Sequence, residues 1–455
     1  MTNPALASLV AELGSDIVTS DPAVMDRYRF DWAHDAAAGV PLAVVRAENA
    51  DQIQAAVRWA DQHEVPIVPR GAGSGLSGGS TAVDGGLVVC TERMRAITID
   101  PAARVAIVEP GALNIEVKAA AAEHGLWYPP DPSSYEICSI GGNLATNAGG
   151  LCCVKYGVTT DYVLGLDVVT ADGALLTLGG VRVKDAAGLP LLKLFVGSEG
   201  TLGVITRGIL KLVPKQPERA TVVATFADVD DAARAVVGLC GQIRPAMLEL
   251  MDGLSINLTE DYTRMGLDRS AGAMLITQSD APGPARAFEL EIIERTFSEH
   301  GAKECFVTDD PEEGELFVAA RRAAFPAMER RGSLLLEDVG AAVPQLPELI
   351  KGVGKIAADH GVEIPVVAHA GDGNTHPNII YDPTDPQSVS QAQQAFEEVM
   401  QLAISLGGTI TGEHGVGRLK KSALPDQIGP DVMALTRKIK YALDPKSIMN
   451  PGAIL

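Results

Sequence analysis

Two short glycine-flanked stretches carry the side chains best suited to metal or acid–base chemistry. The first contains His369 and His376, with turn-forming residues at 372–374 between them, and the second contains Glu413 followed by His414. Two histidines and a carboxylate are a common ligand set for a catalytic divalent metal with one open position. His414 would then be free to act as a base. The alternative is a set of hydrogen-bonded loop histidines, and the residue types alone favour neither interpretation.

Residues 69–80, which read PRGAGSGLSGGS, are the main candidate for an anion site. Glycines let successive backbone N–H groups approach an anion closely, and diphosphate is the usual ligand of such a run. Residues 73–78 match a GxGxxG pattern, but that fingerprint opens a helix, whereas residues 87–90 predict a strand. No Gly-Lys-Ser/Thr follows, so a nucleoside-triphosphate loop is excluded. The alternative is a flexible surface connection.

A second long polar stretch, residues 129–150, is stiffened by prolines at its start and loosened by glycines at its end. Ser139, Asn143, Thr146 and Asn147 between them suit hydrogen bonding to a polar ring or a ribityl chain. Long loops in compact domains are usually functional or disordered, and an Ω-loop packed on itself is the alternative.

The composition excludes several classes of protein. A net charge of −21 argues against nucleic acid as a partner, because phosphate binding draws on clustered Lys and Arg. The sequence has no apolar run of transmembrane length and no signal peptide, so we expect a cytoplasmic protein, with peripheral docking at a membrane left open. The 6 cysteines form no CxxC pair, which argues against an iron–sulfur cluster and favours small core residues in a reducing compartment.

The remaining pattern predicts the elements that position these stretches. Residues 1–35 are expected to be largely helical, and residues 42–45, 50–63 and 65–68 predict strand, helix and strand before the glycine loop. After residue 214, strands and helices alternate without glycine-rich loops, which predicts a second, α+β domain from about residue 216. Further strands are expected at 96–99, 105–109, 162–170, 174–179, 204–213, 221–226, 274–278, 305–308, 364–368 and 377–381, and further helices at 113–124, 229–239 and 286–300.

In this order along the chain, the motifs resemble those of the FAD-linked 2-hydroxy-acid dehydrogenases with a vanillyl-alcohol-oxidase type of flavin domain. That family includes D-lactate dehydrogenase, the FAD subunit of glycolate oxidase and D-2-hydroxyglutarate dehydrogenase. The resemblance extends over about residues 35–455. It rests on residues 69–80, 130–150, 197–203, 369–376 and 412–417 and on the ending DPKSIMNPG at 444–452.

The resemblance implies an α+β fold in three parts. Residues 1–215 are expected to form a vanillyl-alcohol-oxidase (PCMH)-type FAD-binding domain, and residues 216–409 a ferredoxin-like α+β substrate cap. Residues 410–455 are expected to be a helical C-terminal segment that returns to the FAD domain.

The resemblance also implies a set of FAD-binding residues. FAD is expected to be non-covalent, because relatives with covalent FAD carry a histidine in the first glycine loop, where this chain has Gly73 and Ser74. The residues expected around the diphosphate are Arg70, Gly71, Ala72, Gly73, Ser74, Gly75 and Ser77. The other residues expected near the cofactor are Pro130, Asp131, Ser134, Gly141, Asn143, Thr146, Gly150, Glu199, Gly200, Ile205 and Asn450.

The resemblance assigns His369, His376 and Glu413 as ligands of a divalent metal (Zn, Mn or Fe) and His414 as the general base. Arg321 matches the arginine that clamps the substrate carboxylate, a task that suits a guanidinium. Hydroxyglutarate enzymes bring a lysine to the stretch that here reads LLLEDVG at 334–340. Its two acidic residues, Glu337 and Asp338, would repel a second substrate carboxylate, which favours lactate or glycolate.

The expected reaction is oxidation of D-lactate or glycolate to the 2-oxo acid, with metal-assisted deprotonation of the hydroxyl and hydride transfer to flavin N5. We expect a dehydrogenase rather than an oxidase, a quinone, a cytochrome or an electron-transfer flavoprotein as electron acceptor, and a homodimer. The alternatives within the family are D-2-hydroxyglutarate dehydrogenase and the FAD subunit of a multi-subunit glycolate oxidase.

Three alternatives change the chemistry. An alkyl-dihydroxyacetone-phosphate synthase would need consecutive histidines, which the chain lacks. A metal hydrolase would leave the two glycine-rich stretches unexplained. A non-catalytic electron-transfer or subunit role stays open.

Overall fold

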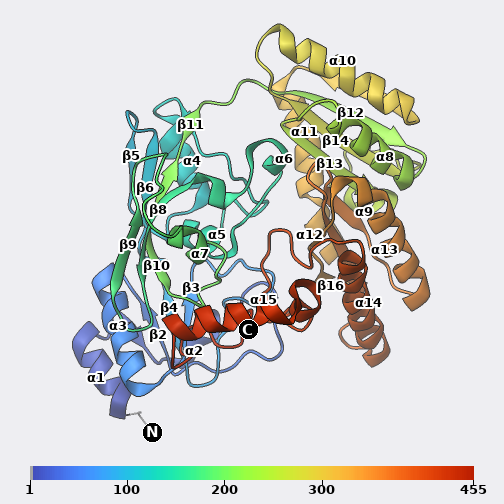
Figure 1. Ribbon diagram of the computed structural model, residues 1–455. Coiled ribbons are helices and arrows are strands. Elements are labelled where there is room, and N and C mark those ends of the chain that lie inside the picture. The colour runs from blue at the N-terminus through green and yellow to red at the C-terminus, as the bar shows by residue number, and fades with distance from the viewer. Residues whose placement is uncertain (1–3) are drawn as a thin grey trace. The chain divides into compact units, whose positions relative to one another are not determined.

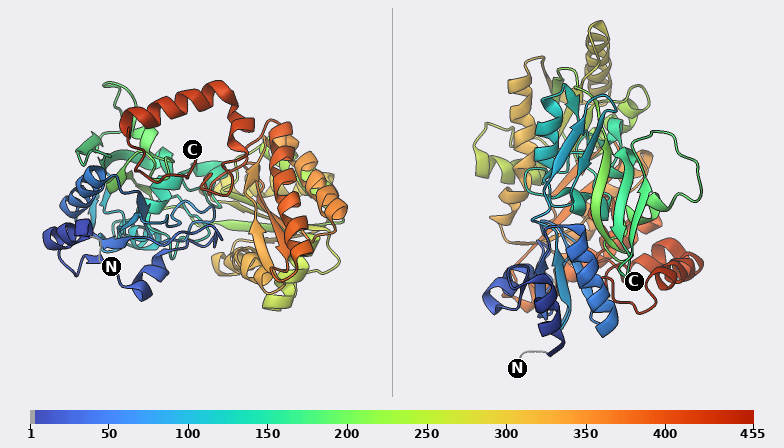
Figure 2. Two further views of the ribbon diagram at one scale, coloured as in Figure 1. Left: turned by 90° about the horizontal axis from the view of Figure 1, so that it is seen from below. Right: turned by 90° about the vertical axis from the view of Figure 1, so that its left-hand side faces the viewer.

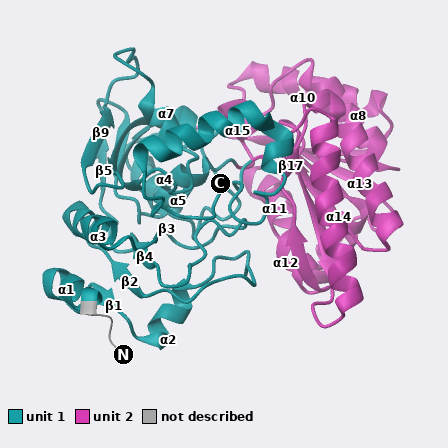
Figure 3. Cartoon of the chain, turned by 60° about the horizontal axis from the view of Figure 1, so that its bottom comes forward, with its two compact units in different colours: residues 1–149, 158–215, 413–455 teal, residues 150–157, 216–412 magenta. Residues whose placement is uncertain are grey.

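A computed structural model describes residues 4–455 of the chain (Figure 1). By the density of contacts, the chain divides into two compact units (Figure 3). Unit 1 contains residues 1–149, 158–215 and 413–455, and unit 2 contains residues 150–157 and 216–412. The chain therefore passes from one unit to the other after residues 149, 157, 215 and 412.

The first sheet of unit 1 is small and mostly parallel. Its segment of the chain contains α1 (Pro4–Leu13), β1 (Val18–Thr19), α2 (Pro22–Met25), η1 (Asp26–Tyr28), β2 (Ala43–Arg46), α3 (Ala50–His63), β3 (Ile67–Arg70) and β4 (Leu87–Cys90). The strand order is β1-β2-β4-β3, and both β2 and β3 pair in parallel with β4. The Asn49 side chain caps the start of α3, and Glu64 in the left-handed conformation ends it. The glycine loop leaves from the end of β3.

The second sheet of unit 1 is antiparallel, with the order β5-β6-β10-β8-β9. The helices α4 and α5 pack on this sheet, and their side chains Val117, Ile140 and Leu144 are buried in the core between them and the sheet. The elements of this part are β5 (Ile97–Asp100), β6 (Val105–Val108), α4 (Asn114–Ala122), β7 (Leu126–Trp127), α5 (Ile140–Thr146), η2 (Thr159–Tyr162), β8 (Val163–Val169), β9 (Leu175–Gly179), α7 (Leu191–Phe195), β10 (Val204–Lys211) and β11 (Val213–Pro214).

The C-terminal segment of unit 1 returns to the first sheet. After α15 (Leu424–Leu443), drawn in red in Figure 1, the backbone N–H of Ile67 donates to the carbonyl of Ile448, at 2.7 Å. The N–H of Asn450 donates in turn to the carbonyl of Ile67, at 2.7 Å. The end of the chain is thereby fixed beside β3, the strand that leads into the glycine loop.

Unit 2 is built on an eight-stranded antiparallel sheet. The first half of its chain runs through β12 (Ala220–Phe226), α8 (Val229–Cys240), β13 (Met247–Asp252), α9 (Gly253–Thr263), β14 (Ala273–Ser279), α10 (Pro284–Glu299) and β15 (Ala302–Thr308). The order β15-β12-β14-β13 makes β12–α8–β13–β14–α10–β15 a ferredoxin-like unit, with α9 inserted. The sheet continues through β18 (Val366–His369), β19 (Asn374–Tyr381) and β16 (Ser333–Leu336), and β17 (Val339–Gly340) also pairs with β19.

Helices cover both faces of this sheet, because its central strands are apolar on both sides. On β13, Leu248 and Leu250 share a core with α8, α10 and α13 (Leu346–His360). Met247 and Met251 point the other way, into a core with α9, α11 (Pro311–Arg322) and α12 (Ala324–Glu329). The short helix η3 (Val343–Gln345) precedes α13, and α14 (Pro386–Ser405) packs beside α13 and against β19 (Figure 2).

Residues 150–157 cross into unit 2, where α6 (Cys153–Tyr156) lies and Leu151 joins the core. Asp280, at the end of β14, accepts hydrogen bonds from Lys155 and Tyr156 and, at 2.9 Å, from Gln216. One buried carboxylate therefore holds two of the segments through which the chain enters this unit.

Two predictions differ from the structure. Residues 129–150 were expected to be loop throughout, but they contain α5, because Ser139 caps it and Ile140 and Leu144 become buried. The predicted helical lead-in contains α1, a short helix α2 and a two-residue strand.

Cys90, Cys138 and Cys152 are buried as expected, whereas Cys305 is exposed. Within residues 4–455, no helix combines the length and apolar content that crossing a bilayer requires.

Candidate active site

A tight hairpin brings His369 and His376 together in unit 2. His369 ends β18, His376 lies on β19, and the two ring centroids are 5.0 Å apart. Gly373 in the turn has φ of +84°, and a Cβ there would lie 2.1 Å from the carbonyl oxygen of Ala341, so only glycine fits. Both histidines are buried, at 3% and 7% relative exposure. The two imidazoles therefore lie edge to face, at 86°, where water has little access.

Each histidine also has a carboxylate partner in unit 2. The Nδ1 of His369 lies 2.8 Å from Oε1 of Glu249, and the Nδ1 of His376 lies 3.6 Å from Oδ1 of Asp338. A carboxylate hydrogen-bonded to Nδ1 fixes the tautomer and orientation of a ring, as at His369, and directs Nε2 to ligand binding. The sequence interpretation missed both carboxylates.

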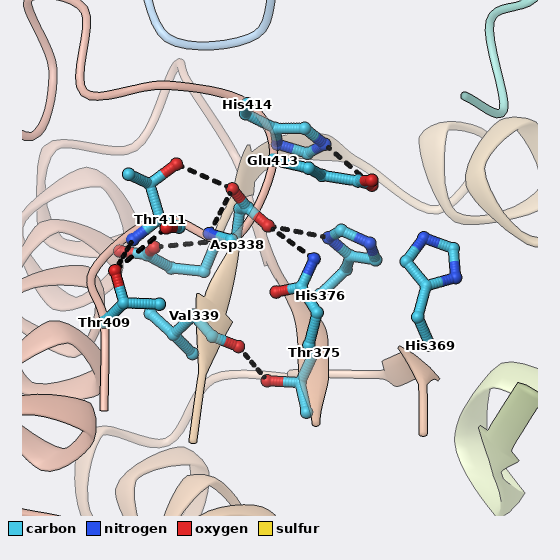
Figure 4. Close-up of polar contacts among 12 residues, drawn as sticks. Asp338, Val339, His369, Thr375, His376, Thr409, Thr411, Glu413 and His414 are labelled. Carbon is cyan, nitrogen blue, oxygen red and sulfur yellow. Dashed lines mark hydrogen bonds and ion pairs between the residues drawn. The ribbon is translucent and has the colours of Figure 1, made fainter. Parts of the chain in front are cut away.

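Asp338 organises the segment that leads to Glu413 (Figure 4). Its carboxylate is fully buried and accepts hydrogen bonds from Asn374 (3.0 Å), the Thr411 hydroxyl (2.8 Å) and the Gly412 backbone N–H (2.9 Å). The residue after Gly412 is Glu413, so the chain enters Glu413 from a backbone position that Asp338 fixes in unit 2.

These contacts change the interpretation of the acidic pair at 337–338. We expected Glu337 and Asp338 to repel a second substrate carboxylate, but both side chains are fully buried. Asp338 is engaged with donors of its own unit, and Oε2 of Glu337 accepts the backbone N–H of Asp338 at 3.2 Å. The charge argument against a longer diacid therefore loses its support, because these carboxylates serve the fold.

Arg321 lies near the end of α11 and is 6% exposed. Its Nε is 2.9 Å from Oε2 of Glu249, in a buried ion pair. Its Nη2 is buried and has no hydrogen-bond partner among the residues that the structure describes. Burying a guanidinium nitrogen without an acceptor is costly, so this atom indicates a place for an anion.

In unit 1, the glycine loop is held in one conformation from several sides. The Arg70 guanidinium lies over the Tyr28 ring, 5.7 Å from its centroid, and donates to the Ser80 carbonyl at 3.4 Å. Burial lowers the pKa of Arg70. The Ser139 hydroxyl accepts the Ala72 N–H at 3.1 Å, which joins the glycine loop to the second predicted cofactor stretch.

This fixed loop has free donors. Within the described part of the chain, the N–H groups of Gly73, Ser74 and Gly75 donate to no protein acceptor. A preformed loop with free N–H groups is suited to an anion, so anion binding by this loop stays a prediction.

The loop that carries Glu413 and His414 is anchored in unit 1 by backbone contacts. The Ser77 hydroxyl donates to the carbonyl of His414 at 3.0 Å. The Glu199 carboxylate accepts the N–H groups of Val416 (2.7 Å) and Gly417 (2.8 Å), and burial raises its pKa to about 7. The Nε2 of His414 lies 3.8 Å from Oε1 of Glu413. The His414 ring therefore sits on a fixed loop.

Two of the predicted cofactor residues, Glu199 and Asn450, use their side chains for hydrogen bonds to other residues of the protein. Glu199 holds the loop just described, and Asn450 donates from Nδ2 to the carbonyls of Gly79 (2.8 Å) and Glu199 (2.7 Å). Asn450 thereby ties the C-terminal segment to the glycine loop and to the 197–203 turn.

Of the other predicted cofactor residues, Pro130, Asn143 and Thr146 make hydrogen bonds within unit 1. The Asn143 side chain accepts from Asn114 at 3.2 Å, and the Pro130 carbonyl accepts from Asn114 at 3.2 Å. The Thr146 hydroxyl donates to the Gly142 carbonyl at 3.2 Å. Pro130, Asp131, Ser134, Gly141, Asn143, Thr146, Gly200 and Ile205 belong to unit 1, and Gly150 belongs to unit 2.

The comparisons with known proteins agree with the expected FAD-binding domain and its C-terminal partner domain. Residues 41–179 match the family described as an FAD binding domain, and residues 215–454 match the C-terminal domain of the FAD linked oxidases. The chain is 40% identical to the glycolate oxidase subunit GlcD of Bacillus subtilis over 91% of this chain and 88% of the relative. It is 32% identical to a D-lactate dehydrogenase of Archaeoglobus fulgidus over 98% of this chain and 99% of the relative.

Solved structures share the fold at low identity. A p-cresol methylhydroxylase superposes with a TM-score of 0.82 at 18% identity and covers 98% of this chain and 95% of its own. An alkyldihydroxyacetonephosphate synthase superposes with a TM-score of 0.77 at 20% identity over 99% of this chain and 86% of its own. These likenesses confirm the predicted α+β fold with its PCMH-type flavin domain.

Proposed function

The chain belongs to the FAD-linked oxidases, and from this premise we propose that it oxidises a small D-2-hydroxy acid, D-lactate or glycolate, to the 2-oxo acid. The names of two relatives, a glycolate oxidase subunit and a D-lactate dehydrogenase, support this choice. The established part is an oxidoreductase that depends on FAD, and the substrate is the proposal.

One observation on unit 2 carries the proposal. Arg321 and His369 contact the two oxygens of a single buried carboxylate, that of Glu249. A cationic donor and an imidazole are therefore held at a fixed spacing on one face of the sheet. A 2-hydroxy acid presents a carboxylate and a hydroxyl on adjacent carbons, so its carboxylate suits Arg321 and its hydroxyl suits a metal that His369 would help to hold.

The residues present fit both expected cofactors. Residues 73–75 offer backbone N–H groups to a diphosphate, and bound FAD supplies the hydride acceptor. His369, His376 and Glu413 would hold the divalent metal, and two imidazoles with a carboxylate suit zinc, manganese or iron. A metal in such a set lowers the pKa of a bound hydroxyl.

The protein's own groups have separate tasks in this proposal. Arg321 binds the substrate carboxylate through its unpaired Nη2, which orients the substrate. His414 accepts the proton of the substrate hydroxyl as general base. The contact between Ser77 and the backbone of His414 holds the loop of that base in place.

Anaerobic mixing with a panel of 2-hydroxy acids tests the function. Both enantiomers of lactate and of 2-hydroxyglutarate and glycolate are mixed with the purified enzyme, and loss of the flavin absorption is followed. Bleaching by D-lactate or glycolate supports the proposal. Preferential bleaching by D-2-hydroxyglutarate keeps the reaction class and changes the substrate, and no bleaching by any acid overturns the proposal.

A second candidate function is the same oxidation, carried out by this chain as one subunit of a larger complex. Relatives from Bacillus subtilis and Escherichia coli are named as subunits of glycolate oxidase, so this chain could be the FAD subunit of a larger cytoplasmic complex. Its electrons would then pass through a partner to a quinone, a cytochrome or an electron-transfer flavoprotein. Steady-state turnover of the purified chain alone with a soluble quinone would contradict a need for partners.

A further inference from the structure

Glu249 is a lone carboxylate within an apolar strand. It lies on β13 between Leu248 and Leu250, and it is fully buried. Its side chain points to the sheet face of Met247 and Met251, because neighbours along a strand alternate between faces. Burying a carboxylate in such a place is strongly unfavourable unless cations and donors compensate it.

Each oxygen of Glu249 has one partner, and the partners come from different elements of unit 2. Oε1 lies 2.8 Å from Nδ1 of His369 at the end of β18, and Oε2 lies 2.9 Å from Nε of Arg321 on α11. The three side chains are 0%, 3% and 7% exposed, in the order Glu249, His369, Arg321. Bulk solvent therefore screens these contacts little.

For His369, the contact selects the reactive nitrogen. A carboxylate at Nδ1 keeps the proton on that nitrogen and makes Nε2 the ring nitrogen that can bind a metal. For Arg321, the ion pair holds Nε 2.9 Å from Oε2 of Glu249, without the geometry of a hydrogen bond, and so limits the movement of the guanidinium. Nη2, which has no hydrogen-bond partner in the described residues, then points in a fixed direction.

We infer that Glu249 is a positioning residue that sets the spacing between the metal ligand His369 and the substrate clamp Arg321. This inference rests on the proposed function, since it assigns those two roles. It adds a specific consequence: one substitution on β13 weakens two binding events, that of the metal and that of the substrate carboxylate, while FAD binding on unit 1 is unaffected.

The first test is Glu249→Gln, which keeps the size of the side chain and removes its charge. Zn²⁺ is titrated into the metal-free, FAD-containing enzyme by calorimetry against a competing chelator. We expect about 10–100-fold weaker Zn²⁺ binding. KM for the 2-hydroxy acid should rise, and the ratio of flavin to protein should stay at the wild-type value. Unchanged Zn²⁺ affinity would overturn the inference.

Two further variants separate positioning from folding. Glu249→Gln leaves Arg321 as an unpaired buried charge, so Glu249→Gln combined with Arg321→Gln should restore the melting temperature while Zn²⁺ binding stays weak. Recovery of Zn²⁺ affinity in that double variant would overturn the positioning role. Asp252→Asn is the matched control, because Asp252 lies on the same strand and caps α9 instead. It should lower the melting temperature and leave Zn²⁺ affinity unchanged.

Measurements on the wild-type enzyme separate failure of the proposed function from failure of the role of Glu249. If it binds no Zn²⁺ and no 2-hydroxy acid bleaches its flavin, the proposed function fails. If it binds Zn²⁺ and is bleached, but Glu249→Gln behaves in the same way, only the role of Glu249 fails.

Discussion

At the scale of single residues, His414 is anchored to its loop through its backbone. Its backbone carbonyl accepts the Ser77 hydroxyl, whereas its ring lies 3.8 Å from Glu413. His414→Ala should therefore leave the loop and the bound FAD in place and lower the rate of flavin reduction by about 10²–10⁴-fold. Anaerobic stopped-flow reduction by the best substrate measures this rate. A wild-type rate would contradict the role of a base.

Glu199 gives a second prediction at this scale, because burial raises its pKa from 4.5 to about 7. A carboxyl that is protonated more readily in the folded state contributes stability below its unfolded pKa and loses it as the pH rises through its folded pKa. The free energy of unfolding of the wild type relative to Glu199→Gln should thus fall between about pH 4.5 and 7. The total change is on the order of 3 kcal/mol at most.

Urea unfolding of the two FAD-free proteins across that pH range is the measurement. Glu199→Gln is neutral at every pH, so it removes this titration while it keeps a similar shape. Parallel pH profiles for the two proteins would show that Glu199 titrates normally.

At the scale of elements, the glycine loop depends on how closely it approaches α5. A Cβ on Gly71 would lie 2.3 Å from the Ser139 hydroxyl oxygen, which caps α5 and accepts the Ala72 N–H. Gly71→Ala should lower the free energy of unfolding of the FAD-free protein by about 1–3 kcal/mol and reduce the amount of FAD retained on gel filtration. Gly75→Ala is the control, because its nearest neighbour would be Asp31 at 3.5 Å. Equal stabilities of the two variants would contradict this packing.

The local sequence pattern was sufficient to predict elements such as α3 and the hairpin of β5 and β6. The cap at Asn49 and the apolar face of α3 gave that helix its observed bounds, 50–63, and the turn at residues 101–104 joins the predicted hairpin of β5 and β6. Local pattern was insufficient for α5, whose two glycines disfavour a helix that only tertiary burial of Ile140 and Leu144 stabilises.

The partners of the site histidines were out of reach for a different reason. Glu249 and Asp338 lie 120 and 38 residues from His369 and His376, so only the pairing of strands brings them together. The one local signal for Glu249 was a single charge within the apolar run MLELM at 247–251. Such a residue on a strand indicates a buried partner but does not identify it.

At the scale of the whole molecule, the glycine loop and the histidine pair lie in different compact units, whereas the third proposed metal ligand, Glu413, belongs to the same unit as the glycine loop. The anion cradle of the glycine loop lies in unit 1, with its contacts from Ser139 and Asn450. The histidine pair and the buried carboxylates that orient it lie in unit 2. No residue is proposed for both cofactors, so removal of one cofactor should leave the binding of the other largely intact.

A strong chelator makes this separation measurable. Dialysis of the FAD-containing enzyme against EDTA should abolish flavin reduction by the 2-hydroxy acid, because His369 and His376 would no longer hold a cation that favours deprotonation of the substrate hydroxyl. The ratio of flavin to protein should not change, since no residue of the glycine loop is among the proposed metal ligands. Zn²⁺, Mn²⁺ and Fe²⁺ are then added back singly under anaerobic conditions, and the metal that restores the rate is the functional one. Full activity in a sample shown to be free of metal would remove the metal from the mechanism and leave the two histidines with a structural role.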